Sequence, residues 1–158
     1  MSPLTLTCQR SIFCQRLFSL TLLKRSKLAP TDIVHIYCSK IRPILEYACP
    51  VWHGGLTVEQ GEDIEHIQER ALRIAHPGVP YNEALNMSNI PTLQERRTQE
   101  CKKLLEKMQN PQDKLNRILP KARINEKNTR NSLKYPLPEV KTKRYKDSFL
   151  PYALFNCQ

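Results

Sequence analysis

The stretch IVHIYCSKIRPILEYACPVW, residues Ile33–Trp52, carries the clearest core pattern in the chain. Its apolar side chains recur at helical intervals, which indicates one face of a helix packed on a core. They are Ile33, Tyr37, Ile41, Ile44, Leu45 and Ala48. Pro43 lies inside the stretch and lacks an amide proton, so it predicts a kink or a division into two helices. Pro50 and the pair Gly54 and Gly55 are predicted to end the helix.

Helices are also predicted on both sides of this stretch. A basic amphipathic helix is expected from about residue 9 to residue 25. Thr31 is predicted as the N-cap of the helix that contains Ile33. Residues 57–60 read TVEQ, a capping-box pattern that predicts a helix to about Ala75. The expected apolar stripes of the first and last of these helices are Phe13, Leu17, Leu20 and Leu23 or Lys24, and Ile64, Ile67, Ala71 and Ile74.

The second half of the chain predicts shorter elements and then loses its pattern. One or two helical turns are expected from Tyr81 to Met87, a helix from Thr92 to about Asn110, and a short helix from Gln112 to Leu119. The predicted fold is mostly α, a small bundle of about four to six helices with a basic, largely irregular C-terminal tail. Three regions are expected: a basic N-terminal amphipathic helix over 1–30, a helical core over 31–119, and over 120–158 a basic flexible tail with a short aromatic docking segment.

The net charge of +10 is unevenly distributed along the 158 residues. Residues 1–30 carry +5 and no acidic residue, residues 31–95 carry −5, and the remainder is again strongly basic. Basic ends suit a polyanion such as RNA or DNA, because each neutralised phosphate releases counterions and makes binding sensitive to salt. A solvated basic tail without a ligand is the alternative.

No catalytic constellation is visible in the sequence. The four aspartates, Asp32, Asp63, Asp113 and Asp147, are scattered, whereas a two-metal nucleotidyl transferase needs clustered carboxylates. No histidine begins a His-x-Asp pair, and there is no glycine-rich phosphate loop. We therefore expect no enzyme activity, no metal site and no cofactor.

The cysteines and the apolar runs bear on the compartment. Six cysteines without a Cys-x-x-Cys pair favour free thiols in a reducing compartment. No apolar run approaches the roughly 20 residues that span a bilayer, so no membrane association is expected. A cytoplasmic or nuclear location is favoured. The acid-free first 30 residues also have the composition of a mitochondrial transit peptide, which is the alternative.

Aromatic and basic residues alternate near the C-terminus, as they do on surfaces that hold phosphates with cations and stack rings on bases. The candidate nucleic-acid-binding residues are Lys134, Lys141, Lys143, Arg144 and Lys146, together with Arg96 and Arg97 of the phrase IPTLQERR. Phe149 and Tyr152 favour a structural role instead, in which they attach the tail to its own domain.

Four phrases occur in order along the chain: IYCSKIRPILEYACPVWHGGLT, IQERALRI, IPTLQERR and KYPLPEVKTKRYKDSFLPYAL. Together they resemble the C-terminal thumb and post-thumb region of reverse transcriptases from LINE-type, non-LTR retrotransposons. The resemblance covers about residues 11–154 and implies a helical element that grips nucleic acid beside a polymerase palm. The paired aspartates of that family's palm are absent here, so the resemblance implies a non-catalytic fragment of an RNA-directed DNA polymerase.

The resemblance also bears on partners. It implies weak, salt-sensitive binding of RNA or DNA, with the missing palm or a second copy of the chain as further partners. One alternative is a helical protein-interaction module that uses the stripe from Ile64 to Ile74 as an exposed face. The same region also resembles short vertebrate domains associated with an alkylation-repair dioxygenase homologue, without the dioxygenase chemistry, since no His-x-Asp pair is present.

Overall fold

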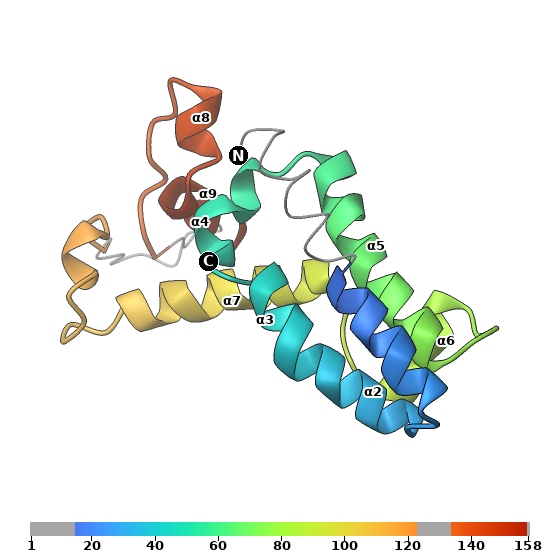
Figure 1. Ribbon diagram of the computed structural model, residues 1–158. Coiled ribbons are helices and arrows are strands. Elements are labelled where there is room, and N and C mark those ends of the chain that lie inside the picture. The colour runs from blue at the N-terminus through green and yellow to red at the C-terminus, as the bar shows by residue number, and fades with distance from the viewer. Residues whose placement is uncertain (1–14, 123–133, 158) are drawn as a thin grey trace. The chain divides into compact units, whose positions relative to one another are not determined.

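The computed structural model describes residues 15–122 and 134–157 (Figure 1). All regular structure in these residues is helical, and they contain no strand, which confirms the predicted mostly α fold. The labelled α-helices, α2 to α9, outnumber the expected four to six. The excess arises because prolines and short turns divide the chain into short helices.

The described residues form two compact units. The first contains residues 15–47 and 57–96, and the second contains residues 48–56, 97–122 and 134–157. Helix α7 (Leu93–Met108) gives its first turn to the first unit and its remainder to the second. The expected regions 1–30, 31–119 and 120–158 follow the order of the chain, whereas these units combine segments that are distant in sequence.

Residues 30–45, in the first unit, form three consecutive helical pieces. Helix α2 (Pro30–Ile36) continues into a π-helical turn (Tyr37–Ile41) and then into α3 (Arg42–Leu45). The amide of Arg42 donates to the carbonyl of Tyr37, five residues back. The wider turn precedes Pro43, which has no amide proton to donate to residue 39 and whose ring needs extra room. The helix is therefore not divided in two at Pro43 but continues through it, with the π-helical turn just before the proline.

Several details of this stretch differ from the sequence prediction. The N-cap is Ala29 rather than Thr31, because Pro30 takes the first helical position that suits its fixed φ angle. Ala48 adopts a left-handed conformation (φ 51°) and is exposed, and Ile44 is exposed as well. Pro50 does not end a helix but lies in the first turn of α4 (Cys49–Trp52), where its missing amide costs nothing.

Helix α5 (Val58–Ala75) has the predicted bounds and the predicted cap. The side chain of Thr57 accepts from the Gln60 amide at 3.2 Å, and the Gln60 side chain accepts from the Thr57 amide at 3.2 Å. The buried face differs from the predicted stripe, since Ile67 and Ile74 are only half-buried. The residues of α5 that are buried are Ile64, Gln68, Ala71, Leu72 and Ala75. Helix α5 therefore does not expose the stripe that the interaction-module alternative requires.

A buried glutamine joins three elements of the first unit. Gln68 accepts from the Tyr37 hydroxyl at 3.0 Å, and it donates to the Tyr81 hydroxyl at 3.1 Å and to the Pro91 carbonyl at 3.0 Å. Tyr81 begins α6 (Tyr81–Ser88), and it also donates to Glu65. Buried polar groups need such partners because desolvation is costly, and these contacts fix α5 against the π-helical turn, α6 and the segment at Pro91.

The second unit is built around the remainder of α7. Helix α9 (Phe149–Asn156) packs on it, and the buried cluster there comprises Leu105, Tyr135, Ala153 and Leu154. The helix expected over 112–119 is reduced to one 3-10 turn, Asn116–Ile118. The tail expected to be largely irregular contains α8 (Lys143–Lys146) and α9. Residues 123–133 of that tail lie outside the described part, as do residues 1–14.

Candidate nucleic-acid interface

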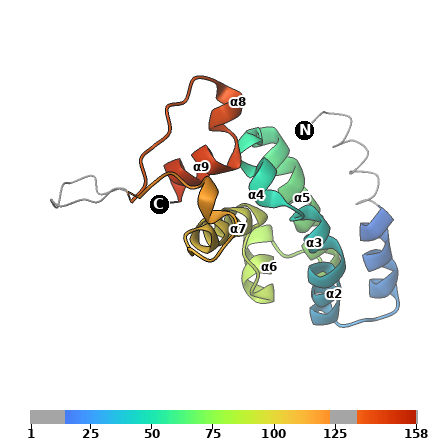
Figure 2. The same cartoon turned by 90° about the vertical axis from the view of Figure 1, so that its left-hand side faces the viewer.

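Four of the candidate cations gather on and beside α8. Thr142 caps this helix, since its side chain accepts from the Tyr145 amide at 3.3 Å. All six residues from 141 to 146 are exposed, and none of them is acidic. The cationic members are Lys141, Lys143, Arg144 and Lys146, which we call the α8 basic cluster. Figure 2 shows α8 between the loop that precedes it and α9, which follows it.

An aromatic side chain lies within the α8 basic cluster. Tyr145 is 44% exposed and is flanked in sequence by Arg144 and Lys146. Exposed rings beside cations suit a ligand that offers both phosphates and unstacked bases. The arrangement therefore supplies the two kinds of contact that single-stranded nucleic acid requires, on one short segment.

Helix α9, which follows α8, is held against the 3-10 turn of the second unit. Tyr152 on α9 and His53 in the 3-10 turn His53–Gly55 contact each other edge to face, with the Tyr152 hydroxyl 3.0 Å from Nε2 of His53. A Cβ atom on Gly54 would lie 2.6 Å from the carbonyl oxygen of Asp147, so only glycine allows this close approach. Tyr152 is thus half-buried, and its contact with His53 attaches α9, which directly follows α8, to the 3-10 turn of the same unit.

Electrostatics around His53 distinguish it from the exposed cluster. Burial, and then the nearby charge of Arg97, lower the pKa of His53. Burial raises the pKa of Tyr152, which keeps its hydroxyl protonated and able to donate to His53. Nδ1 of His53 is buried without a hydrogen-bond partner in the described residues. The pair is neutral at physiological pH and contributes attachment of α9, not anion binding.

Lys134 lies apart from the α8 basic cluster in its contacts. Its Nζ donates to Oε1 of Gln109 at 2.6 Å and lies 5.5 Å from the ring centroid of Tyr135. The side chain is exposed, so it remains accessible to a phosphate after release of one surface hydrogen bond.

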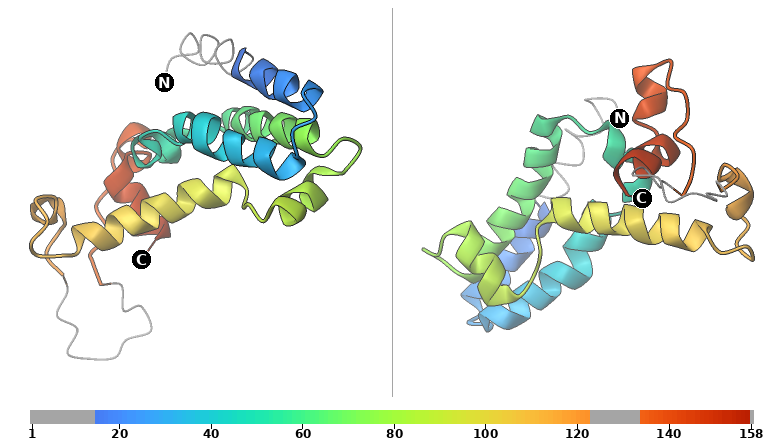
Figure 3. Two further views of the ribbon diagram at one scale, coloured as in Figure 1. Left: turned by 60° about the horizontal axis from the view of Figure 1, so that its bottom comes forward. Right: turned by 180° about the vertical axis from the view of Figure 1, so that it is seen from behind.

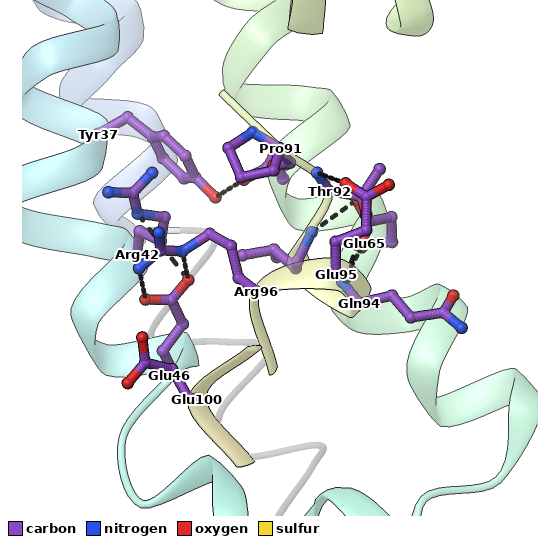
Figure 4. A network of polar contacts seen from close by, with 12 residues as sticks. Tyr37, Arg42, Glu46, Glu65, Pro91, Thr92, Gln94, Glu95, Arg96 and Glu100 are labelled. Atoms are coloured by element: carbon purple, nitrogen blue, oxygen red, sulfur yellow. Dashed lines mark hydrogen bonds and ion pairs between the residues drawn. The ribbon is translucent and has the colours of Figure 1, made fainter. Parts of the chain in front are cut away.

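Arg96 and Arg97 are engaged inside their units. Arg96 binds the carboxylate of Glu46 through two guanidinium nitrogens, one of them 3.0 Å from the carboxylate (Figure 4). Arg42 lies on the same carboxylate at 3.9 Å. Arg97 is 3% exposed. Neither guanidinium is exposed as the cations of the α8 basic cluster are. The candidate interface therefore consists of the four cations of that cluster, and Lys134 is exposed but lies outside the cluster.

The sequence does contain a signal for the burial of Arg97. Leu93, Arg97, Cys101 and Leu105 follow one another at intervals of four, and all are buried. Residues four apart share one helix face, so Arg97 lies on the inward face of α7 and Arg96 on a flank. Charge alone made the two arginines look equivalent.

A polar network at the start of α7 was not predicted. The carboxylate of Glu65 accepts from the amides of Leu93 and Gln94 at 3.1 and 3.3 Å (Figure 4). Thr92 and Glu95 form a second capping box, with bonds of 3.2 and 3.1 Å. A carboxylate at a helix N-terminus is stabilising, so these contacts explain the sharp start of α7.

In the described residues no group of three or more histidine, cysteine or acidic side chains is placed to hold a metal ion. Burial raises the pKa of the Cys101 thiol to about 12, so this cysteine is a packed thiol rather than a nucleophile. The helices in the described part of the chain include none long and apolar enough to cross a membrane. Comparison of the chain with protein-family models, with curated proteins and with solved structures gives no match.

Proposed function

We propose that this chain is a non-catalytic helical module that binds RNA or DNA through the α8 basic cluster. The single observation that supports the proposal is the exposure of four cations and one aromatic ring within residues 141–146, on a segment attached to a packed unit. The proposed origin is the thumb and post-thumb region of a non-LTR reverse transcriptase, which rests on the four sequence phrases. A fragment of this kind binds backbone without chemistry of its own.

Binding is expected to be weak and governed by salt. Four phosphate contacts give a slope of log K against log salt of about −3 for single strands. Affinity then falls about 60-fold between roughly 50 and 200 mM salt. Micromolar or weaker affinity is expected at the lower concentration, with little sequence preference, because cations contact phosphates and the ring of Tyr145 stacks on any base.

The test is fluorescence anisotropy of labelled single-stranded RNA, single-stranded DNA and duplex DNA across this salt range. A variant with glutamine at all four positions of the α8 basic cluster is expected to lose the salt slope and most of the affinity. The matched control replaces four other exposed lysines of the same unit by glutamine, with the same change in net charge: Lys102, Lys107, Lys114 and Lys121. Equal losses in the two variants, or no binding by the unaltered chain at low salt, would refute the proposed site.

A further inference from the structure

The first unit contains a cavity that no function considered above uses. It lies between the helical segment 15–25 and α5 and has a volume of about 430 Å³. The segment, drawn in blue, runs alongside α5 in the views of Figure 3. Leu17, Phe18, Thr21 and Lys24 line one wall, and Arg70, Arg73 and Ile74 line the other. Both sets follow helical spacing, so each wall is one face of one helix.

The described residues that line it combine an apolar surface with cations, and none of them is acidic. Leu17 is buried and Ile74 half-buried, while Phe18 is 58% exposed, so its apolar ring is accessible to a ligand. Three cationic side chains share the same cavity: Lys24, Arg70 and Arg73. Ligand pockets are typically apolar with a few convergent polar groups that fix orientation, which is the composition found here.

The charges leave the cavity able to accept an anion. Glu69 accepts from His66 and pairs with Arg73, and these two contacts, the His66 bond first, lower the pKa of Glu69. Lys24 makes no side-chain hydrogen bond or ion pair with another described residue. Beside apolar walls a charge pair is screened less than in open water, so an acidic head gains more there than on a flat surface.

We propose that this cavity binds a small amphipathic anion, an acidic head on an apolar body. The apolar body lies against Phe18 and Ile74, and the head lies near Lys24. A medium-chain alkyl carboxylate has this chemistry. The proposal is independent of the α8 basic cluster, which belongs to the second unit.

The test is titration of the ¹⁵N-labelled full chain, followed by amide chemical shifts, with two probes: decanoate below its micelle-forming concentration and decyltrimethylammonium. Decanoate is expected to shift the amides of residues 17–24 and 70–74 in a saturable manner. The cation with the matched chain is expected to bind at least about tenfold more weakly. Equal binding of the cation, or shifts confined to other residues, would overturn the proposal.

Variants separate the cavity from the general basicity of the chain. Lys24→Gln is expected to weaken anion binding about two- to fivefold, whereas Arg25→Gln, an adjacent exposed cation that does not line the cavity, is expected to leave it unchanged. Phe18→Ser is expected to weaken it about five- to tenfold, and Leu22→Ser, also exposed, serves as its control. All four changes are at accessible or partly accessible positions, so the helical circular dichroism is expected to persist. The same affinity for Lys24→Gln and Arg25→Gln would refute the site.

Discussion

Replacement of Gln68 by methionine tests whether one buried amide organises the first unit. Methionine fills a similar volume but makes none of the three hydrogen bonds of Gln68. Tyr81 keeps its bond to Glu65, and the carbonyl of Pro91 belongs to an exposed residue that water can reach. The hydroxyl of Tyr37, on a residue only 1% exposed, is left without its partner.

The expected loss of unfolding free energy follows from what happens to each of the three hydrogen-bond partners of Gln68. An orphaned buried hydroxyl costs about 1–3 kcal/mol, and loss of a hydrogen bond to a hydrated carbonyl costs about 1 kcal/mol. Gln68→Met should therefore destabilise the first unit by about 2–4 kcal/mol. At an m-value of about 2 kcal/mol per molar urea, the unfolding midpoint falls by about 1–2 M.

The assay is urea unfolding followed by far-ultraviolet circular dichroism, and Tyr37→Phe supplies the other arm of a double-mutant cycle. Tyr37→Phe alone should cost about 1–2 kcal/mol, and the double variant should cost less than the sum of the two, because the orphaned hydroxyl is gone. A midpoint for Gln68→Met that matches the unaltered chain, or strictly additive effects, would refute the reasoning.

Three further predictions concern other contacts. Leu154→Ala should destabilise the second unit by about 2–4 kcal/mol, because Leu154 is 1% exposed, whereas Phe155→Ala at an exposed position should change stability by less than about 0.5 kcal/mol; urea unfolding followed by Trp52 fluorescence distinguishes them. The lowered pKa of His53, caused by burial and by the neighbouring guanidinium, means that the unfolded chain takes up its proton first as the pH falls. Stability of the second unit should thus be complete above about pH 6.5 and decline below it, and His53→Gln should flatten that profile; an unchanged profile would count against the assignment. Thr57→Ala should cost about 1 kcal/mol by removal of the N-cap, while Thr31→Ala, which removes no cap, should shift the thermal midpoint negligibly.

Local signals in the sequence were sufficient for several helices. The TVEQ pattern at residues 57–60 predicted both the start and the capping contacts of α5, because a capping box involves only residues three apart. Pro43 likewise indicated an irregular helix, which the structure has as a π-helical turn just before the proline and not as a division in two. In contrast, the predicted stripe omits Gln68, although its position four residues from both Ile64 and Leu72 places it at core spacing. A polar residue at such a position is informative only when its distant partners are known.

The candidate interface shows the same division between local and distant information. Exposure of the cations at 141–146 was expected from composition, and the structure has them exposed. The burial of Arg97 required the register of α7 to be combined with its charge, and the pairing of Arg96 depended on Glu46, fifty residues away. The cavity beside Lys24 was invisible in the sequence, because its two walls come from helices that composition cannot place side by side.

The π-helical turn also explains how the buried residues between Ile33 and Leu45 remain on one side of the helix. Its innermost residues, Ile33, Tyr37, Ile41 and Leu45, are each separated by four positions. An ordinary α-helix has about 3.6 residues per turn, so a repeat of four drifts about 40° at each step and would carry Leu45 about 120° away from Ile33. A locally unwound segment that bonds five residues back takes up the surplus. The number of residues per turn, and not only the missing amide proton of Pro43, therefore decides which residues of this stretch lie on the same buried face.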